Sequence, residues 1–471
     1  MVAVLLALLP PLLVGSLAVW SCWPRVGPAA WRAVLAGALG IGLALGATSW
    51  TYFAWVVCAG PSRPGFLLVE TLFFALLAAA LVVAVRRFPA PDGGDLPRPP
   101  HTRWTWAIWA AFGLVLLAAL ATLGLALART PHGEIDAWQI WNLHARLLTR
   151  GGDEWREPFA RLSALYHPDY PLLVPAAVAR GWTCAGEEST LVPRLVAFLF
   201  AAATVGLLVA GLTLLRTPAQ GCLAGLVLLA TPPYLRYTAA QYGDVPLGLY
   251  FLAGVLLFEV RDRLRSGSER LPVLAGVVAG MAAWTKNEGQ LFVIATLLAR
   301  LVVAWAGGRA SRPAPRALVA FAAGLLPFAA ALAYFKLGVA PTNDLVAGQE
   351  GGATLPRLLD GERLWEVVSG MVEALVTVVG GAVLVLALYA ALLGRARGDG
   401  GRGLHTLTVL AILLAGYALV YLTTPLPLSL HIFLSADRLW LQLWPCALLL
   451  FFLNVAAPEE RLAADPAGPR R

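Results

Sequence analysis

Residues 191–215 have the sequence LVPRLVAFLFAAATVGLLVAGLTLL, in which Arg194 is the single charged residue. A helix of ~20 apolar residues is long enough to cross the ~30 Å hydrocarbon core of a bilayer, so this stretch predicts a transmembrane helix. It is apolar throughout, whereas the strands of a membrane β-barrel alternate apolar and polar residues. Similar runs recur along the chain. The sequence therefore predicts an all-α, polytopic helical membrane protein.

The composition of the 471 residues agrees with this fold class. Hydrophobic residues make up 59% and charged residues 13%, and the mean hydropathy is +0.73. Soluble domains carry about 25% charged residues, so a soluble enzyme, a disordered tail and a secreted disulfide scaffold are excluded. The five cysteines are scattered without a C-x-x-C pair and suggest neither a metal site nor a disulfide framework.

The net charge of +8 does not indicate nucleic-acid binding. The basic residues are almost all arginine, with Lys286 and Lys336 as the two lysines, a bias typical of a GC-rich bacterial genome. A nucleic-acid partner would require a basic stripe interleaved with exposed aromatic residues, and the sequence has none.

The apolar runs predict about thirteen spans, and the Lys/Arg-rich loops predict their orientation. The spans are expected at 1–20, 33–58, 65–85, 104–128, 191–215, 218–235, 245–260, 271–284, 290–306, 317–335, 367–393, 404–423 and 439–457. Residues 1–103 form an N-terminal three-span extension, 104–457 the core, and 458–471 a short cytoplasmic tail. The loops placed in the cytoplasm carry Arg86, Arg87, Arg98, Arg103, Arg261, Arg263, Arg265, Arg270, Arg309, Arg312, Arg316, Arg395, Arg397 and Arg402, and the tail ends in Arg470 and Arg471.

With this orientation the long segment 129–190 is extracytoplasmic, and ionisable residues gather at the outer ends of the spans. Such residues in a membrane protein are functional candidates by default. The most informative are Glu134 and Asp136, two residues apart at the mouth of a span and followed by Trp138 and Trp141. The tryptophans favour a helix in the interface. A capping box between Asp136 and Gln139 is the structural alternative.

Further candidates lie at 166–171 and 241–246. His167, Asp169 and Tyr170 stand between Pro168 and Pro171 in a stiff segment that, taken alone, favours a rigid loop without chemistry. Asp244 precedes the span at 245–260. An acid followed closely by a proline is also an ordinary helix start.

The next candidates carry positive charge. Lys286 and Glu288 interrupt two short spans, and a lysine ammonium with free helix N–H groups beside it suits a phosphate. A snorkelling Lys286–Glu288 ion pair is the alternative. Arg438 is expected just before the last span, with an interfacial pair to Asp437 as its alternative.

The six histidines are too dispersed for metal-ligand spacing. His132, His144 and His167 share the outer segment with the two acids, so a metal stays open, although solvated or packed histidines are the commoner case. Glu70 and Glu373 lie inside spans, close to their outer ends.

Together these motifs resemble the GT-C superfamily of glycosyltransferases. The likeness is to bacterial family 39-like transferases, relatives of protein O-mannosyltransferases and aminoarabinose transferases, and it covers about 104–457. Glu134–Asp136 is similar to the acidic pair of the family's first outer loop, and His167–Pro171 to its Pro-rich segment. Gly243–Pro246 is similar to its second-acid motif and Trp284–Gly289 to its Lys-Gly motif. The three preceding spans and the lack of a large soluble C-terminal domain depart from the family.

The resemblance implies an enzyme of the bacterial inner membrane that moves a sugar from a polyprenyl-phosphate carrier to a hydroxyl or phosphate at the outer face. The acceptor is a lipid, glycan or protein. Asp136 is the expected base, with inversion, and Glu134 or Asp244 the orienting acid. The donor phosphate is expected at Lys286 and Arg438, with Arg236 as a weaker third. His167, Asp169, Tyr170 and Glu288 are expected to orient substrate. No cofactor is required, although Glu134 and Asp136 would bind a divalent cation if the donor were a diphosphate.

Two other functions are compatible with the sequence. A lipid or solute transporter or flippase requires polar groups near the midplane and a repeated span pattern, neither of which is evident. A non-catalytic scaffold with this fold would leave the polar residues dispersed. A separation of Asp136 from Lys286 by more than ~15 Å would favour the scaffold, because a donor head group could not contact both.

Overall fold

A computed structural model describes residues 2–60, 63–88, 103–264, 269–307, 315–343, 354–396 and 403–464. In these ranges the backbone is helical apart from short connections and one β-bridge between Arg395 and Val455. The longer helices are α1 (Val2–Cys22), α2 (Ala29–Ala59), α3 (Arg63–Arg87), α4 (Arg103–Arg129), α8 (Leu191–Leu215), α11 (Asp244–Leu264), α12 (Arg270–Thr285), α13 (Asn287–Ala306), α14 (Pro315–Gly338), α17 (Gly361–Leu393), α18 (Leu404–Thr423) and α19 (Leu428–Asn454). The shorter helices are η1 (Ala137–Trp141), α5 (Asn142–Arg150), η2 (Gly152–Glu154), α6 (Glu157–Arg161), η3 (Ala164–Tyr166), α7 (Leu173–Ala185), α9 (Pro218–Leu229), α10 (Pro232–Ala239), α16 (Thr354–Leu359) and α20 (Pro458–Ala464).

The helices confirm a multi-pass membrane protein but not the count of thirteen spans. Within the described ranges ten helices are long and apolar enough to cross a membrane, or eleven if α10 and α11, bent by 120° at the turn between them, form one broken span. Within the described residues the predicted runs coincide with helices except at 230–231 and 455–457, yet α9 and α12 have 12 and 16 residues. At ~1.5 Å per residue both are shorter than the ~30 Å core. Pro232 and Pro233 divide the expected 218–235 run into α9 and α10.

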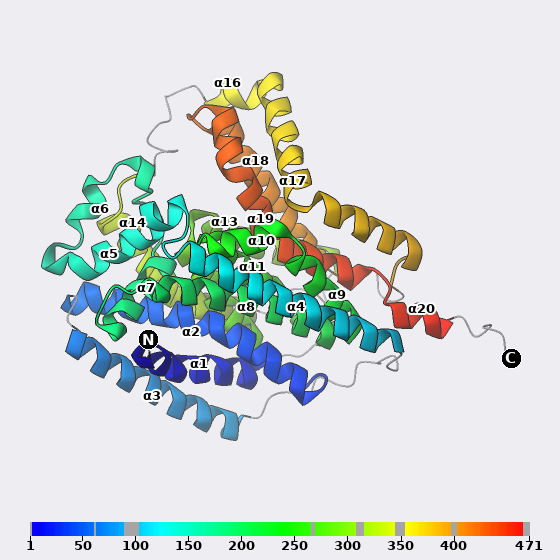
Figure 1. Cartoon of the computed structure of the whole chain (residues 1–471), viewed down its shortest axis with the longest axis horizontal. Helices are drawn as coiled ribbons and strands as arrows, with labels where there is room; N and C mark the ends of the chain where they lie inside the picture. Colours follow the sequence, from blue (N-terminus) through cyan, green and yellow to red (C-terminus); the bar gives the residue numbers. More distant parts are fainter. Residues whose placement is uncertain are drawn as a thin grey trace.

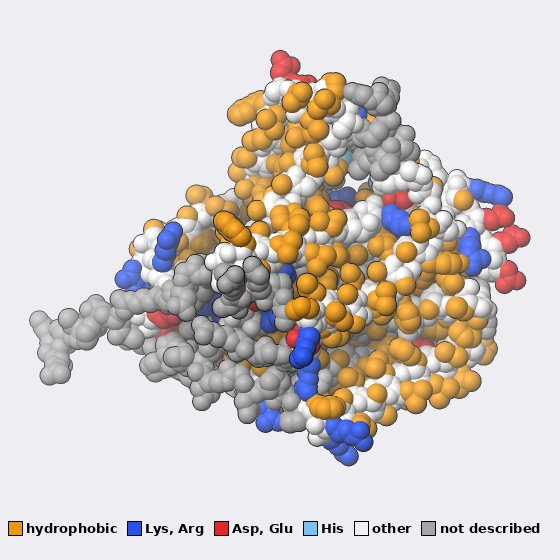
Figure 2. Space-filling view, turned by 180° about the vertical axis from the view of Figure 1, so that it is seen from behind, with side chains coloured by type: hydrophobic (Ala, Val, Ile, Leu, Met, Phe, Trp, Pro, Cys, Tyr) orange, Lys and Arg blue, Asp and Glu red, His pale blue; other side chains and the backbone are white. Residues whose placement is uncertain are grey.

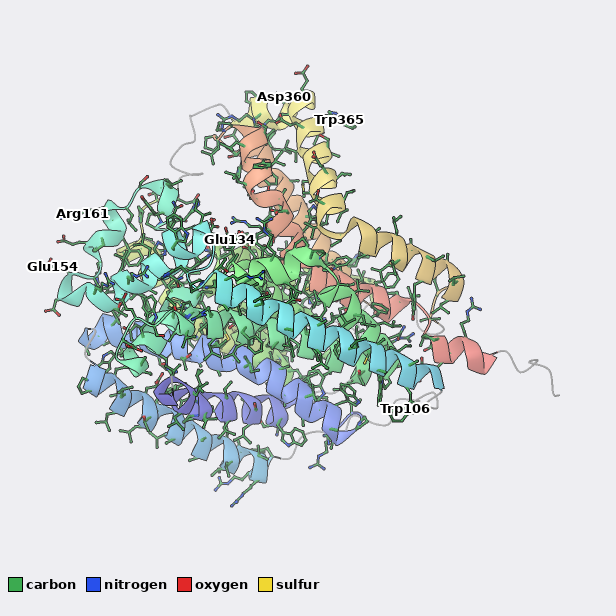
Figure 3. All side chains as sticks on the ribbon, viewed as in Figure 1. Trp106, Glu134, Glu154, Arg161, Asp360 and Trp365 are labelled. Carbon is green, nitrogen blue, oxygen red and sulfur yellow. The ribbon has the colours of Figure 1, made fainter. Side chains whose placement is uncertain are left out.

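The segment between α4 and α8 lies at one end of the bundle, which we call the loop end. Figure 1 shows α5, α6 and α7 there and α20 at the opposite end. In Figure 3, Glu134 and Trp106 mark the two ends of α4, with Glu134 close to the loop helices. The helices α16, α17, α18 and the start of α19 rise beside the loop end.

The outer surface of the bundle is suited to lipid. Figure 2 shows a broad face of hydrophobic side chains, with charged groups gathered mainly towards its margins. Leu76, Leu114 and Val319 are each about 70% exposed. Soluble monomers rarely expose apolar patches of such extent, so this face is the one we expect to meet the hydrocarbon core.

The N-terminal helices are packed into the core through α2. The hydroxyl of Tyr250 donates to the Gly42 carbonyl oxygen at 2.9 Å, and the indole of Trp284 donates to Ser49 at 3.2 Å. The loop helix α7 is tied to α3 by the buried Arg180–Glu70 pair at 2.9 Å. Glu373, the other acid that the sequence placed inside a span, is on α17, and its side chain is exposed. The three-span extension therefore supports the loop end.

The opposite end of the chain is also docked. In α20, Glu459 accepts from Thr105 at 3.2 Å, and Glu460 pairs with Arg216 at 3.2 Å. Several arginines of the predicted cytoplasmic loops lie outside the described residues, namely Arg98, Arg265, Arg309, Arg312, Arg397, Arg402, Arg470 and Arg471.

The start of the last long helix was predicted wrongly. The sequence placed the span at 439–457, after Arg438, whereas α19 begins at Leu428 directly after Pro427. No proline or glycine occurs between Leu428 and Arg438, so the helix continues through the polar residues. Arg438 is consequently inside α19, and its charge must be compensated by other elements.

Candidate functional site

The acidic pair is positioned by a glycine turn at the end of α4. Gly133 has φ +73°, a left-handed backbone conformation that residues with a side chain rarely adopt. A Cβ there would also lie 2.5 Å from the Ala240 carbonyl oxygen. The next backbone N–H, that of Glu134, donates to the same oxygen at 3.2 Å. The turn therefore fixes the acidic pair against the loop between α10 and α11.

Asp136 does not cap the following helix. Its backbone is helical, and its side chain accepts no hydrogen bond from the first turn of η1, so the capping-box alternative with Gln139 is wrong. Instead its carboxylate forms an ion pair with the Arg438 guanidinium in α19. In the following helix Trp138 is exposed and Trp141 is buried, and the placement of this helix in the membrane interface stays a prediction.

Asp244 is brought in by the sharp turn that precedes α11. Gln241 has φ +62°, and a Cβ on Gly243 would lie 2.7 Å from the Trp141 ring, so the backbone and the indole are in close contact. Asp244 is the first residue of α11 and is buried. Asp244 is therefore an ordinary helix start, which was the structural alternative, but its side chain also faces the centre of the site.

Lys286 occupies the break between α12 and α13. Gly289 allows the two helices to meet, because a Cβ there would lie 1.8 Å from the Ala282 carbonyl oxygen. The Lys286 Nζ lies 2.8 Å from Asp244 Oδ1 and 2.8 Å from Glu288 Oε1. Its side chain is 2% exposed. Lys286 thus has the predicted Glu288 partner but is a buried charge, not a snorkelling one.

A glutamine of α19 completes this centre. Gln442 Nε2 donates to Asp244 Oδ1 at 2.6 Å and to Glu288 Oε1 at 3.3 Å. The charged members of the centre are Lys286 and Arg438 on one side and Asp136, Asp244 and Glu288 on the other. Two cations thus face three carboxylates, in contacts drawn from helices that are far apart in the sequence.

The second lysine of the chain supports the same region. Lys336, near the end of α14, donates to the Asp169 carboxylate at 3.2 Å and to Asn287 Oδ1 at 2.8 Å. Asn287 and Asn343 also donate to Asp169 Oδ2, at 2.9 and 2.7 Å. Burial alone would raise the pKa of the Asp169 carboxyl, but Lys336 and the two amides outweigh it and hold that pKa below its usual range. Asp169 therefore anchors the Pro-rich segment to α13 and α14.

The Pro-rich segment forms one wall of a cavity of about 220 Å³ at the loop end. His167 stacks on Tyr170 with ring centroids 4.5 Å apart, and Lys286 lies 5.8 Å from the Tyr170 ring centroid. Burial raises the pKa of the Tyr170 hydroxyl, so that it stays protonated. The cavity also contacts α13, α18 and α19. Its charged or polar lining is His167, Tyr170, Lys286, Asn287, Glu288, Asn343, Tyr417, Tyr421, His431, Ser435 and Arg438.

Arg438 lines this cavity, and one of its guanidinium N–H groups has no hydrogen-bond partner among the described residues. Its Nη1 binds Asp136, whereas its Nε is buried and has no hydrogen-bond partner among the described residues. Buried N–H groups are nearly always satisfied, so a water or a ligand atom is expected to supply the acceptor for this one.

Glu134 and Arg236 form a separate pair beside the centre. Their side chains approach to 3.5 Å and are 38% and 65% exposed. Arg236 is absent from the described lining of the cavity that Lys286 and Arg438 share. A chain of contacts joins this pair to Arg438. Arg236 lies 5.5 Å from the Tyr237 ring centroid, the Tyr237 hydroxyl donates to Asp437, and the Asp437 carboxylate accepts from the Arg438 backbone N–H at 2.8 Å. Asp437 thus binds Tyr237, not the Arg438 guanidinium that the interfacial-pair alternative assigned to it.

The described residues contain no group of three or more His, Cys, Asp or Glu side chains arranged to hold a metal ion. His144 is buried with its Nε2 3.1 Å from the Tyr166 carbonyl oxygen, and burial lowers its pKa to about 4. The two carboxylates considered for a divalent cation, those of Glu134 and Asp136, each face a different arginine.

Comparison of the chain with protein-family models, with curated proteins and with solved structures gave no match.

Some residues of the site were missed from the sequence. Lys336 carried a signal, because it is the second of two lysines in an arginine-rich chain and both lysines lie in this region. Gln442 is polar within an apolar helix, which is a weaker signal. Asn287, Asn343 and Tyr237 are ordinary loop or helix-end residues, and their part depends on tertiary packing that local sequence does not reveal.

Proposed function

We propose that this protein is a membrane glycosyltransferase that moves a sugar from a polyprenyl-phosphate carrier to a hydroxyl or phosphate acceptor at its loop end, outside the bacterial inner membrane. The observation that carries the proposal is the cavity shared by Lys286 and Arg438, beside the carboxylate of Asp136. A scaffold would not need these groups near one another, whereas Lys286 and Arg438 line one cavity and Arg438 pairs with Asp136, which favours the transferase.

The donor phosphate would lie against the two cavity-lining cations. A lysine ammonium has three N–H donors, and Asp244 and Glu288 engage two of them on Lys286. Arg438 offers its orphaned Nε. The three surrounding carboxylates oppose an anion, so a phosphate has to replace one of them. The exchangeable one is Asp136, because it pairs with Arg438, whereas Asp244 and Glu288 are each held by both Lys286 and Gln442.

This exchange would also prepare the base. While Asp136 pairs with Arg438, its carboxylate is engaged by the guanidinium instead of by an acceptor hydroxyl. When the donor phosphate takes the place of Asp136 on Arg438, the carboxylate becomes available to the acceptor. The acceptor oxygen then attacks the anomeric carbon and Asp136 takes its proton. The bond from that carbon to the phosphate oxygen breaks with its electron pair, the polyprenyl phosphate leaves, and the anomeric centre inverts.

The leaving group needs charge stabilisation more than protonation, which the two cations would supply. Asp244, Glu288 and Gln442 would hold Lys286 in place, and His167, Tyr170 and Asp169 would shape the sugar side of the cavity. No metal or other cofactor is part of this mechanism.

The test is sugar transfer by purified protein in proteoliposomes supplied with radiolabelled polyprenyl-phosphate sugars. We expect Asp136→Asn to bind donor and lose transfer, and Lys286→Ala and Arg438→Gln to weaken donor binding. EDTA should have no effect. Arg156→Gln is the matched control, since Arg156 is half-buried, bonds the Tyr334 hydroxyl and is absent from the lining of the cavity. Label that stays on every carrier in the wild type would overturn the proposal.

A further inference from the structure

A second cavity, distinct from the one that Lys286 and Arg438 line, lies between α2, α4, α8, α9 and α10. It has a volume of about 410 Å³, within the range of ligand pockets, and the side chains that line it are apolar apart from the hydroxyl of Tyr234. That hydroxyl is already bonded, because it donates to the Ala201 carbonyl oxygen at 2.8 Å. We call this cavity the α4 groove.

The depth of the α4 groove matches one leaflet of a bilayer. It follows α4 from Phe112 to Leu123, a rise of roughly 17 Å at ~1.5 Å per residue, and half of a ~30 Å core is ~15 Å. Leu123 lies six residues before Arg129, where α4 ends at the loop end. The groove therefore begins about 9 Å below that end, at the depth of the first part of a lipid chain.

A charged pair stands where the groove approaches the loop end. Tyr234 and Leu235 line the groove, and the next residue of the same helix is Arg236, 65% exposed and paired with Glu134. A cation over an apolar groove complements an anionic lipid with one chain below and its head group above. Glu134 is two residues from Asp136, so the head group of such a lipid lies next to the proposed base.

We propose that the α4 groove and Arg236 bind the acceptor of the reaction and that this acceptor is an anionic membrane lipid with a free hydroxyl. This inference rests on the proposed function and reassigns Arg236 from the donor phosphate to the acceptor. Donor and acceptor then approach the Asp136–Arg438 pair from two different cavities, one lined by α13, α18 and α19 and the other by α4, α8 and α10.

The binding test uses phosphatidylglycerol with a photoreactive diazirine on one chain, with a matching phosphatidylcholine as reference, in proteoliposomes of the full chain. Crosslinks should map to α4 and α8 and be several-fold stronger for phosphatidylglycerol. Ala202→Phe should reduce them about tenfold, because Ala202 is an exposed residue that lines the groove, so that a larger side chain fills the groove without entering the core. Arg236→Gln should abolish the preference for phosphatidylglycerol.

The matched control is Leu117→Phe, since Leu117 is 67% exposed on α4 and does not line the groove. Crosslinks that are equal for the two lipids, or unchanged in Ala202→Phe, would mean boundary lipid only and would overturn the inference.

The transfer test separates this inference from the proposed function. With donor turning over, label should move to a product that extracts with the lipids, and Ala202→Phe should lower that transfer at least tenfold while carrier binding stays unchanged. Label that moves to a protein or to a water-soluble glycan would overturn the lipid acceptor and leave the transferase standing. A donor that is never consumed would overturn the proposed function, and the crosslinking result would still decide the lipid site.

Discussion

The buried ion pair between α3 and α7 offers the sharpest test of how the N-terminal helices support the loop end. Arg180 donates to both carboxylate oxygens of Glu70, with distances from 2.9 to 3.2 Å, and to the Ala7 carbonyl oxygen at 2.6 Å. The two side chains are 2% and 6% exposed. Arg180→Met leaves the Glu70 carboxylate buried without a cation, and breaking a buried pair in this way costs about 3–5 kcal/mol.

The assay is thermal unfolding of the purified protein in detergent. At about 2 °C per kcal/mol for a chain of this size, we expect Arg180→Met to lower the Tm by about 6–10 °C. Adding Glu70→Gln should recover part of the loss, because it removes the unpaired charge, and the double-mutant cycle gives the coupling. Arg161→Met is the control: Arg161 is 79% exposed in a surface pair with Glu157, worth at most about 0.5 kcal/mol. A Tm for Arg180→Met equal to that of the control, or no recovery in the double variant, would refute the reasoning.

Three further predictions concern the loop end. Burial holds the pKa of His144 at about 4, whereas an unfolded histidine titrates near ~6.5. The free energy of unfolding should therefore fall by up to about 3 kcal/mol as the pH drops between those values. Between pH 7.5 and pH 5 the Tm should fall less for His144→Gln than for the wild type, and equal falls would contradict this. Gly289→Ala should abolish the yield of folded protein, because the added Cβ would lie 1.8 Å from the Ala282 carbonyl oxygen. Gly124→Ala is the control and should express normally, because a Cβ there would have no atom within 4 Å. Similar yields of monodisperse protein for the two variants would contradict this. Lys336→Met should lower the free energy of unfolding by about 1–3 kcal/mol at pH 7, because the Asp169 carboxylate then keeps only its amide partners. The depressed pKa of Asp169 makes the contribution of Lys336 fully present above about pH 4 and progressively lost as the pH falls from there through the lower folded pKa. A loss of Tm in Lys336→Met that does not shrink below pH 4 would contradict this.

The fold class could be predicted from the sequence because apolar length is a local property. The run at 191–215 is α8 with the same ends, and the break at Lys286 was visible from its polar neighbours. The count of spans was less predictable, since α9 and α12 are as apolar as true spans but shorter. Their length is limited by Pro232 and by the Lys286 break, and hydropathy does not weigh these breaks.

The candidate site was predictable as a set of residues but not as a set of contacts. Asp136 and Arg438 are 302 residues apart, and nothing near either one indicates the other. The predicted position of Arg438 was wrong because residues 428–438 are too polar to be counted in an apolar run, although they continue the helix. Lys336 was overlooked because it lies at the end of a long apolar helix, where a lone cation usually marks the membrane surface.

The roles proposed for Glu134 and Asp136 follow from different partners. Two carboxylates two residues apart suggested one shared task, yet one faces Arg236 and the other Arg438. The helical turn between them directs the two side chains to separate cations. The proposed roles of the two acids therefore differ, with Asp136 beside Arg438 of the donor cavity and Glu134 beside Arg236.

The most direct test of the central claim is a single-turnover measurement on the Asp136→Asn variant. Protein in excess would be mixed with a radiolabelled polyprenyl-phosphate sugar in proteoliposomes, and the rate at which label leaves the carrier would be compared with that of the wild type. If Asp136 is the base, the rate should fall by about 10²–10⁴ while carrier binding is retained. A rate within threefold of the wild type, with binding unchanged, would contradict the assignment of Asp136 and the mechanism built on its pair with Arg438.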